Sequence, residues 1–373
     1  MKKNFLIISI ISLFSWSGCI SEYDPGIEGY SNILVVEGFV TDGTTVIKLK
    51  RSVSLSESLS DAPVVNNAEV YVETSDGETF LPSTISEGSY YIQVGDMDVN
   101  KSYRVKIAVD GHTYASEFLT PIETPPIDTL TFYQKSKGDL IETRINSTGT
   151  DETSRYYMWS FNEIWEIKSE VMALATQEEI GGPITMHYPY SPYHYCWKWG
   201  NSNSILIGSS YKLNENKINE VKIAENLPTS DRFSMIYFIE ARQNALRKET
   251  YDYFNTLKMN AESTGSIFGP TPSEMKGNIE CLTDNTVPVI GYVEVSFSQY
   301  KTQIHDASVF SEMYEKSRRD CPIFETVGQA EAAGISDVTV AFDAYSFIGR
   351  ICVDCRMLGG TKRKPAFWPN DHI

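Results

Sequence analysis

The sequence has few basic residues for its length and, beyond its N-terminus, no long apolar run. Its 373 residues include 32 lysines and arginines against 49 aspartates and glutamates, which leaves a formal net charge of −17. Proteins that bind nucleic acid need a basic surface to neutralise phosphates, so this balance argues against a nucleic-acid partner. No stretch past the N-terminus approaches 18 uninterrupted apolar residues, so we predict no transmembrane helix there.

The sequence also lacks the motifs of the common enzyme classes. It contains no Gly-x-Ser-x-Gly, no His-Glu-x-x-His and no phosphate-binding glycine loop. Ser-x-x-Lys occurs at Ser209 and at Ser273, but no Lys-Thr-Gly follows either match. We therefore expect a protein that is not an enzyme, with no catalytic residue, no cofactor and no metal site.

The N-terminus reads as a targeting segment. Two lysines precede an apolar run from Phe5 to Phe14, which is about half the length of roughly 20 residues that spans a bilayer. This pattern predicts a signal peptide over residues 1–18. The following Ser-Trp-Ser-Gly-Cys resembles the bacterial lipobox, so we expect Cys19 to be lipidated. The alternative is an ordinary secreted protein in which Cys19 is incidental.

Residues 19–31 then form a predicted lipidated tether that holds the protein to the membrane. Glu22 and Asp24 make its start acidic, which resembles the signal that sends Bacteroidota lipoproteins to the cell surface. We expect a protein of the cell outer membrane, anchored by lipid and facing the surface. A solvated spacer is the alternative reading of the same residues.

The body of the chain is predicted to be mainly β. Residues 32–120 contain six or seven short alternating runs, separated by turn dipeptides such as Asp76-Gly77 and Asp110-Gly111. Asp-Gly between alternating runs is a strong hairpin signal, because glycine adopts positive φ without steric cost. These residues predict an Ig-like or prealbumin-like β-sandwich.

A second strand-rich domain is predicted for residues 129–373, after a proline-rich linker at 121–128. Its longest alternating run covers residues 156–167. One amphipathic helix is expected at about residues 245–262, where apolar side chains share one stripe and Gly265 lies beyond the end. A Cys-x-x-Cys segment lies near the C-terminus of this domain.

Five cysteines remain besides Cys19. In an oxidising envelope they predict two disulfides and one leftover thiol, but the spacing does not choose among the possible pairings. The alternative is a zinc or redox site built around the Cys-x-x-Cys pair. The five candidates are Cys196, Cys281, Cys321, Cys352 and Cys355.

The densest aromatic segment spans residues 187–199. Aromatic rings with polar edges bind sugars, peptides or the rim of a partner protein. The four residues that we expect to contact such a ligand are Tyr190, Tyr193, Trp197 and Trp199. The alternative is a loop that folds back over the second core, since Tyr and Trp bury large areas.

Several motifs of the C-terminal half carry a family resemblance. They include residues 265–273, Pro288–Tyr292, Cys352–Arg356 and Gly359–Trp368. In this order they resemble the Bacteroidota lipoprotein family catalogued as domain of unknown function 4249. The resemblance implies an envelope lipoprotein near TonB-dependent outer-membrane receptors, and it lends no catalytic residue.

Together these observations predict a non-catalytic binding or accessory subunit of a TonB-dependent nutrient-uptake system. Its partners would be the receptor, the membrane through the lipid anchor, and a small-molecule, glycan or peptide ligand that the sequence does not identify. The alternative function is a structural lipoprotein of envelope assembly or adhesion.

Overall fold

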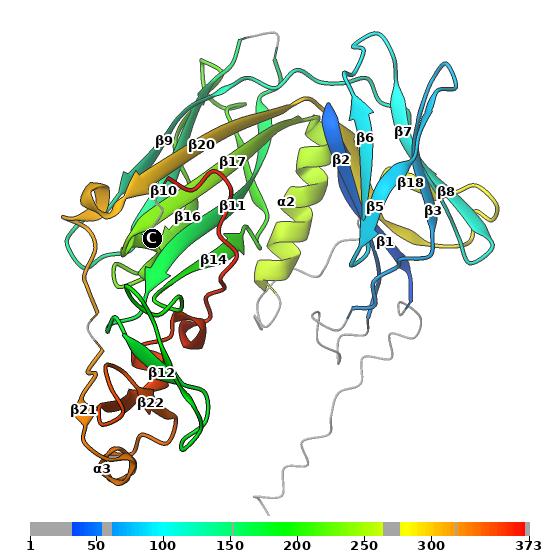
Figure 1. The fold of residues 1–373 in the computed structure, drawn as a ribbon. Coiled ribbons are helices and arrows are strands. Elements are labelled where there is room, and N and C mark those ends of the chain that lie inside the picture. Colours follow the sequence, from blue (N-terminus) through cyan, green and yellow to red (C-terminus); the bar gives the residue numbers. More distant parts are fainter. Residues whose placement is uncertain (1–31, 54–61, 151–152, 264–276, 318, 370–373) are drawn as a thin grey trace, which may run out of the picture.

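The computed structural model describes residues 32–53, 62–150, 153–263, 277–317 and 319–369. The predicted signal peptide, Cys19, the tether and Gly265 lie outside the described residues. The described chain is mainly β, as predicted, and forms two β-rich bodies with one longer helix between them (Figure 1).

The first body is a sandwich of two five-stranded sheets. One sheet has the order β19-β1-β2-β6-β5, with β1 Leu34–Val40, β2 Gly43–Arg51, β5 Pro82–Ser86, β6 Ser89–Gly95 and β19 Val289–Val295. The other has the order β18-β8-β7-β3-β4, with β3 Glu69–Thr74, β4 Thr79–Phe80, β7 Tyr103–Val109, β8 His112–Ser116 and β18 Ile279–Cys281. Alternate residues of both sheets fill one apolar core, which explains the period of two in the sequence. The turn between β7 and β8 places both Asp110 and Gly111 at positive φ, which the Asp-Gly signal requires.

Two strands of this sandwich come from the range assigned to the second domain. Strand β19 pairs in parallel with β1, from Leu34 opposite Val289 to Val40 opposite Val295, and β18 pairs with β8. The boundary drawn after residue 120 is therefore corrected: the first body needs residues 279–295 to cover an edge of each sheet. At Gly291, which has a φ of +147°, a Cβ atom would lie 2.0 Å from the Val36 carbonyl oxygen, so this pairing requires glycine.

The proline-rich stretch is packed against both bodies and is not a free linker. Ile122 forms a β-bridge with Ser296, and the buried Thr124 hydroxyl donates to the Phe297 carbonyl oxygen at 2.6 Å. The Thr124 hydroxyl also accepts the Ala245 N–H at 2.8 Å. These contacts hold in place the segment through which the chain passes from the first body to the second.

The second body is another sandwich. Its larger sheet has the order β14-β11-β17-β20, with β15 also on β11: β11 Tyr156–Lys168, β14 Tyr195–Asn201, β15 Leu206–Ser209, β17 Ile236–Leu246 and β20 Ser298–Asp306. The facing sheet has the order β16-β10-β9, with β9 Ile127–Tyr133, β10 Ile141–Thr148 and β16 Lys217–Asn226. Aromatic side chains such as Trp159, Tyr237 and Phe310 fill the core between them. The long run predicted at residues 156–167 is β11.

Helix α2, Lys248–Ser263, starts three residues later than predicted. Ala245 and Leu246 are fully buried at the end of β17, so the sheet, not the helix, takes them. The helix packs Tyr253 and Phe254 in one cluster with Tyr292 of β19 and Met158 of β11. It therefore contacts both bodies (Figure 1).

A smaller region extends from one end of the second body (Figure 1). It contains β12 Ala175–Gln177, β13 Ile184–Met186, β21 Ile323–Phe324, α3 Val327–Ala332, β22 Val338–Val340 and β23 Phe347–Gly349. Its own apolar cluster includes Ala341, Ile348 and Val353. None of the helices in the described ranges has the length and apolar character needed to cross a membrane.

Candidate functional site

The five cysteines form two disulfides and leave one thiol, as predicted. Cys196 bonds to Cys355, with 5.7 Å between their Cα atoms, and Cys321 bonds to Cys352, with 5.9 Å between theirs. Cys281 is free and buried in the first body. The two cysteines of the Cys-x-x-Cys segment therefore serve two different bridges. Within the described residues, no group of three or more His, Cys, Asp or Glu side chains is placed to hold a metal ion.

The four aromatic residues predicted for ligand contact lie in two environments. Tyr190 and Tyr193 are half-buried in the loop before β14, whereas Trp197 and Trp199 lie on β14 itself. Trp197 is 5 % exposed and packs in a cluster with Ile236 and Trp368, while Trp199 is 42 % exposed. Trp197 is thus part of a small core, and Trp199 presents its ring to solvent.

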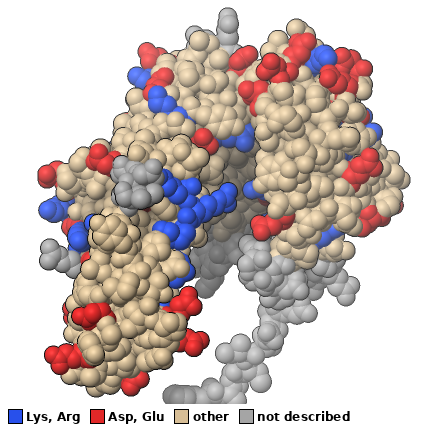
Figure 2. Space-filling model, viewed as in Figure 1, with Lys and Arg blue, Asp and Glu red and all other residues tan. Residues whose placement is uncertain are grey.

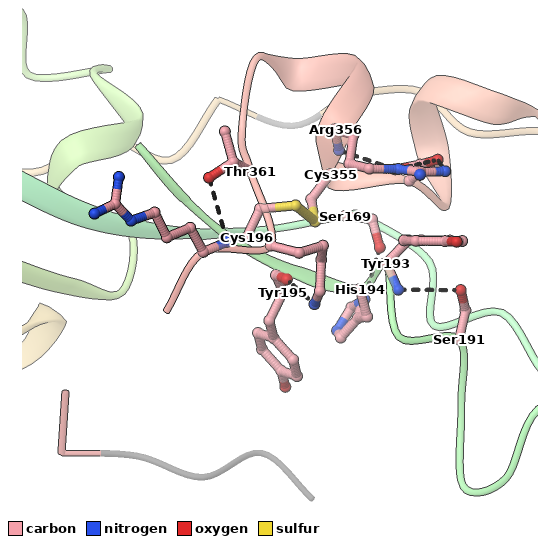
Figure 3. The surroundings of a disulfide bond; sticks show 12 residues. Ser169, Ser191, Tyr193, His194, Tyr195, Cys196, Cys355, Arg356 and Thr361 are labelled. Carbon is pink, nitrogen blue, oxygen red and sulfur yellow. Dashed lines mark hydrogen bonds and ion pairs between the residues drawn. A yellow bond between two sulfur atoms is a disulfide. The ribbon is translucent and has the colours of Figure 1, made fainter. Parts of the chain in front are cut away.

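The C-terminal segment lies across the outer face of the larger sheet of the second body. Trp197 and Thr361 exchange backbone hydrogen bonds of 2.9 Å in both directions, which makes a short β-bridge. Figure 3 shows Thr361 beside the disulfide between Cys196 and Cys355. Beyond this bridge, the Phe367 ring lies 4.7 Å from the Phe238 ring. At Gly360 a Cβ atom would come within 2.5 Å of the Cys196 Cβ, so glycine permits the close approach.

This segment brings basic side chains onto the aromatic rings of the predicted site. The Arg356 guanidinium lies 3.5 Å from the centre of the Tyr193 ring, and the Lys362 ammonium lies 5.6 Å from that of Trp197. Both distances are within the range of cation–π attraction. Asp354 holds Arg356 in place through an ion pair of 2.7 Å.

The electrostatics of the two cations differ. The hydrogen bonds that the Arg356 guanidinium donates to the Asp354 carboxylate raise the pKa of Arg356, so this side chain stays charged. Burial, and then repulsion from Arg356, lowers the pKa of Lys362. Arg363 is exposed and has no side-chain partner within the described residues. We call Tyr193, Trp199, Arg356, Lys362 and Arg363 the aromatic–basic surface.

Basic side chains are concentrated around the aromatic–basic surface. Figure 2 shows Lys and Arg over the C-terminal segment, which is red in Figure 1, beside the recess between the two bodies. In a chain of net charge −17, this surface locally reverses the sign of the charge and would attract anionic groups.

A buried serine–histidine pair beside this surface was not predicted from the sequence. The Ser169 hydroxyl lies 2.6 Å from His194 Nδ1 and donates to the Val171 carbonyl oxygen at 3.0 Å. The pair holds the loop before β14 against the end of β11.

The fold and this surface define a disulfide-bonded, two-body β protein with an exposed aromatic and basic face. The family described as Domain of unknown function (DUF4249) matches residues 20–302, and the chain belongs to that family, as the resemblance predicted. No curated protein matches the chain. The family match ends within β20, so the three basic residues of the aromatic–basic surface, Arg356, Lys362 and Arg363, lie beyond it.

Proposed function

We propose that the protein is an outer-membrane lipoprotein, anchored through Cys19, that serves as a non-catalytic binding or accessory subunit of a TonB-dependent nutrient-uptake system. The aromatic–basic surface is the observation that carries this proposal. Two disulfides in one chain fit an oxidising envelope, where such bonds persist.

The surface has the composition of a protein–protein contact. Trp, Tyr and Arg are the residues most enriched at the energetic centres of interfaces. Stacking on Tyr193 and pairing with Asp354 hold Arg356 in one geometry, so little side-chain entropy is lost when a partner binds. An acidic patch on a receptor would complement Lys362 and Arg363 and would favour the encounter at low salt.

The test is a pull-down of the tagged, lipidated protein from its own membranes in mild detergent, with mass spectrometry of what co-purifies. We expect one TonB-dependent barrel in near-stoichiometric amount. Recovery of the lipidated protein alone would contradict the accessory role and favour the structural or adhesion alternative. A Cys19→Ala variant serves as the anchoring control, and it should leave the membrane fraction.

A further inference from the structure

A polar pocket of about 340 Å³ opens in the second body, and its lining includes none of the four aromatic residues that the sequence singled out. It lies between the connection from β14 to β15 on one sheet and the end of β16 on the other. Its volume falls in the range of small-ligand sites, which is roughly 300–1,000 Å³. None of its lining residues belongs to the aromatic–basic surface.

A buried ion pair forms one wall of the pocket. Glu163 is 4 % exposed, and its Oε1 accepts from Arg232 Nε at 2.8 Å and from Arg232 Nη2 at 2.7 Å. Glu163 Oε2 accepts from the Tyr237 hydroxyl at 2.9 Å. The Arg232 guanidinium also lies 4.2 Å from the centre of the Trp165 ring. These contacts hold the carboxylate, the guanidinium, the phenol and the indole in fixed positions beside the pocket.

This arrangement leaves one donor group for a ligand. Arg232 lines the pocket, and its Nη1 has no hydrogen-bond partner within the described ranges. Burial alone lowers the pKa of Arg232, but the hydrogen bonds and charge of Glu163 outweigh burial, and the pKa is raised. The guanidinium therefore stays charged and fixed.

The other walls are rich in neutral hydrogen-bonding groups. Asn201, Asn203 and Asn226 line the pocket, and their side chains make no hydrogen bond to the described protein. The only other charged residues of the lining, Lys222 and Glu225, pair with each other at 2.6 Å. Every charge of the lining is therefore matched by an opposite one. Phe161 and Leu206 add an apolar face.

We infer that this pocket binds a neutral carbohydrate unit. Planar amide groups both donate and accept hydrogen bonds, and the guanidinium donates them, which suits the hydroxyl groups of a sugar. The Phe161 ring offers a flat apolar surface to the C–H face of a sugar ring. Since both ion pairs are already neutralised, an anionic ligand gains little from the pocket. This inference does not rest on the receptor contact, because it uses other residues.

The test is saturation-transfer NMR of the full mature chain with glucose, galactose, mannose, N-acetylglucosamine and glucuronate. We expect transfer to at least one neutral sugar and no preference for glucuronate over glucose. Replacing Asn201, Asn203 and Asn226 together by alanine should weaken the affinity by about tenfold or more, since three ligand hydrogen bonds are lost.

Asn219→Ala is the matched control, because Asn219 is exposed on the same strand as Asn226 but lies outside the pocket. Its affinity should equal that of the unchanged protein. If the triple variant does not fold, the affinity of the single Asn203→Ala variant is compared with that of the control instead, because Asn203 is exposed. The inference is overturned if no neutral sugar shows transfer, if glucuronate is preferred, or if the pocket variant binds as well as the control.

Discussion

Cys355 is bonded to Cys196 across 159 residues of sequence, and this bond attaches the start of the C-terminal segment to β14. Three residues earlier, Cys352 bonds to Cys321 and closes a loop of the smaller region. One short motif therefore ties two different parts of the molecule. The aromatic–basic surface depends on the first bond only.

This division predicts different effects of removing each bridge. Each bond stabilises the protein by restricting the unfolded chain. Considered separately, the bond that closes 159 residues contributes about 5 kcal/mol and the bond that closes 31 residues contributes about 4 kcal/mol. Replacing Cys196 and Cys355 by alanine should speed amide hydrogen exchange at residues 361–368. Replacing Cys321 and Cys352 should speed exchange at residues 323–349 and leave residues 361–368 protected. Equal exchange at residues 361–368 in both variants would contradict this division.

The receptor contact can be tested by changing charge on the aromatic–basic surface. Lys362→Glu with Arg363→Glu should reduce co-purification of the receptor about tenfold or more, because two attractive contacts become repulsive. Lys137→Glu with Lys212→Glu is the matched control, since both lysines are exposed elsewhere and have no ion pair within the described residues. Capture that falls equally in both double variants would mean that overall charge, not this surface, governs binding.

Local patterns predicted much of the fold. Alternation with a period of two identified β11 and β7, and Asp110-Gly111 identified the turn between β7 and β8, because these signals act within a few residues. The return of β18 and β19 to the first body was not predictable in this way. Their pairing with β8 and β1 joins segments far apart in sequence, and alternation does not specify a partner.

The candidate site was predictable to a similar extent. Aromatic density pointed to Trp197 and Trp199, but the spacing could not tell which ring the C-terminal segment covers. That depends on the bridge between Trp197 and Thr361, which the sequence does not encode locally. The pocket carried one signal that could have been noticed. Glu163 occupies an inward position of β11, where an acidic side chain needs a buried partner.

Alkaline pH should weaken the packing of α2 between the bodies. Burial, followed by the charge of Glu37, raises the pKa of Tyr253 from 10.0 to about 12. Below about pH 10 the phenol is protonated in both the folded and the unfolded protein, and the stability is unaffected. Above pH 10 the unfolded chain ionises first, so the free energy of unfolding falls by up to about 3 kcal/mol as the pH rises through 12.

Tyr253→Phe cannot ionise, so its free energy of unfolding in urea should fall less between about pH 10 and pH 12 than that of the unchanged protein. Tyr188→Phe is the control, because the Tyr188 ring is 99 % exposed. Its pH profile should follow that of the unchanged protein. Identical alkaline slopes for all three proteins would show that Tyr253 does not couple ionisation to folding.

The joint between the bodies depends on a buried carboxylate at the end of β19. Glu294 is fully buried, and it accepts the Arg247 N–H at 2.9 Å and the Thr250 hydroxyl at 2.5 Å. It also pairs with the Arg247 guanidinium. Arg247 and Thr250 lie at the start of α2, so one side chain of the first body holds the helix that packs on the second.

Arg247→Ala should therefore destabilise the protein by about 3 kcal/mol, because it leaves Glu294 buried without its counter-charge. The double variant with Glu294→Gln and Arg247→Ala should recover part of this loss, since no unpaired charge remains. Asp252→Ala is the matched control on the same helix, where an ion pair with Lys248 is exposed, and it should leave the melting temperature unchanged. Exchange along α2 should rise only in the Arg247 variants. If the double variant were less stable than Arg247→Ala alone, the loss would come from packing and not from the unpaired charge of Glu294.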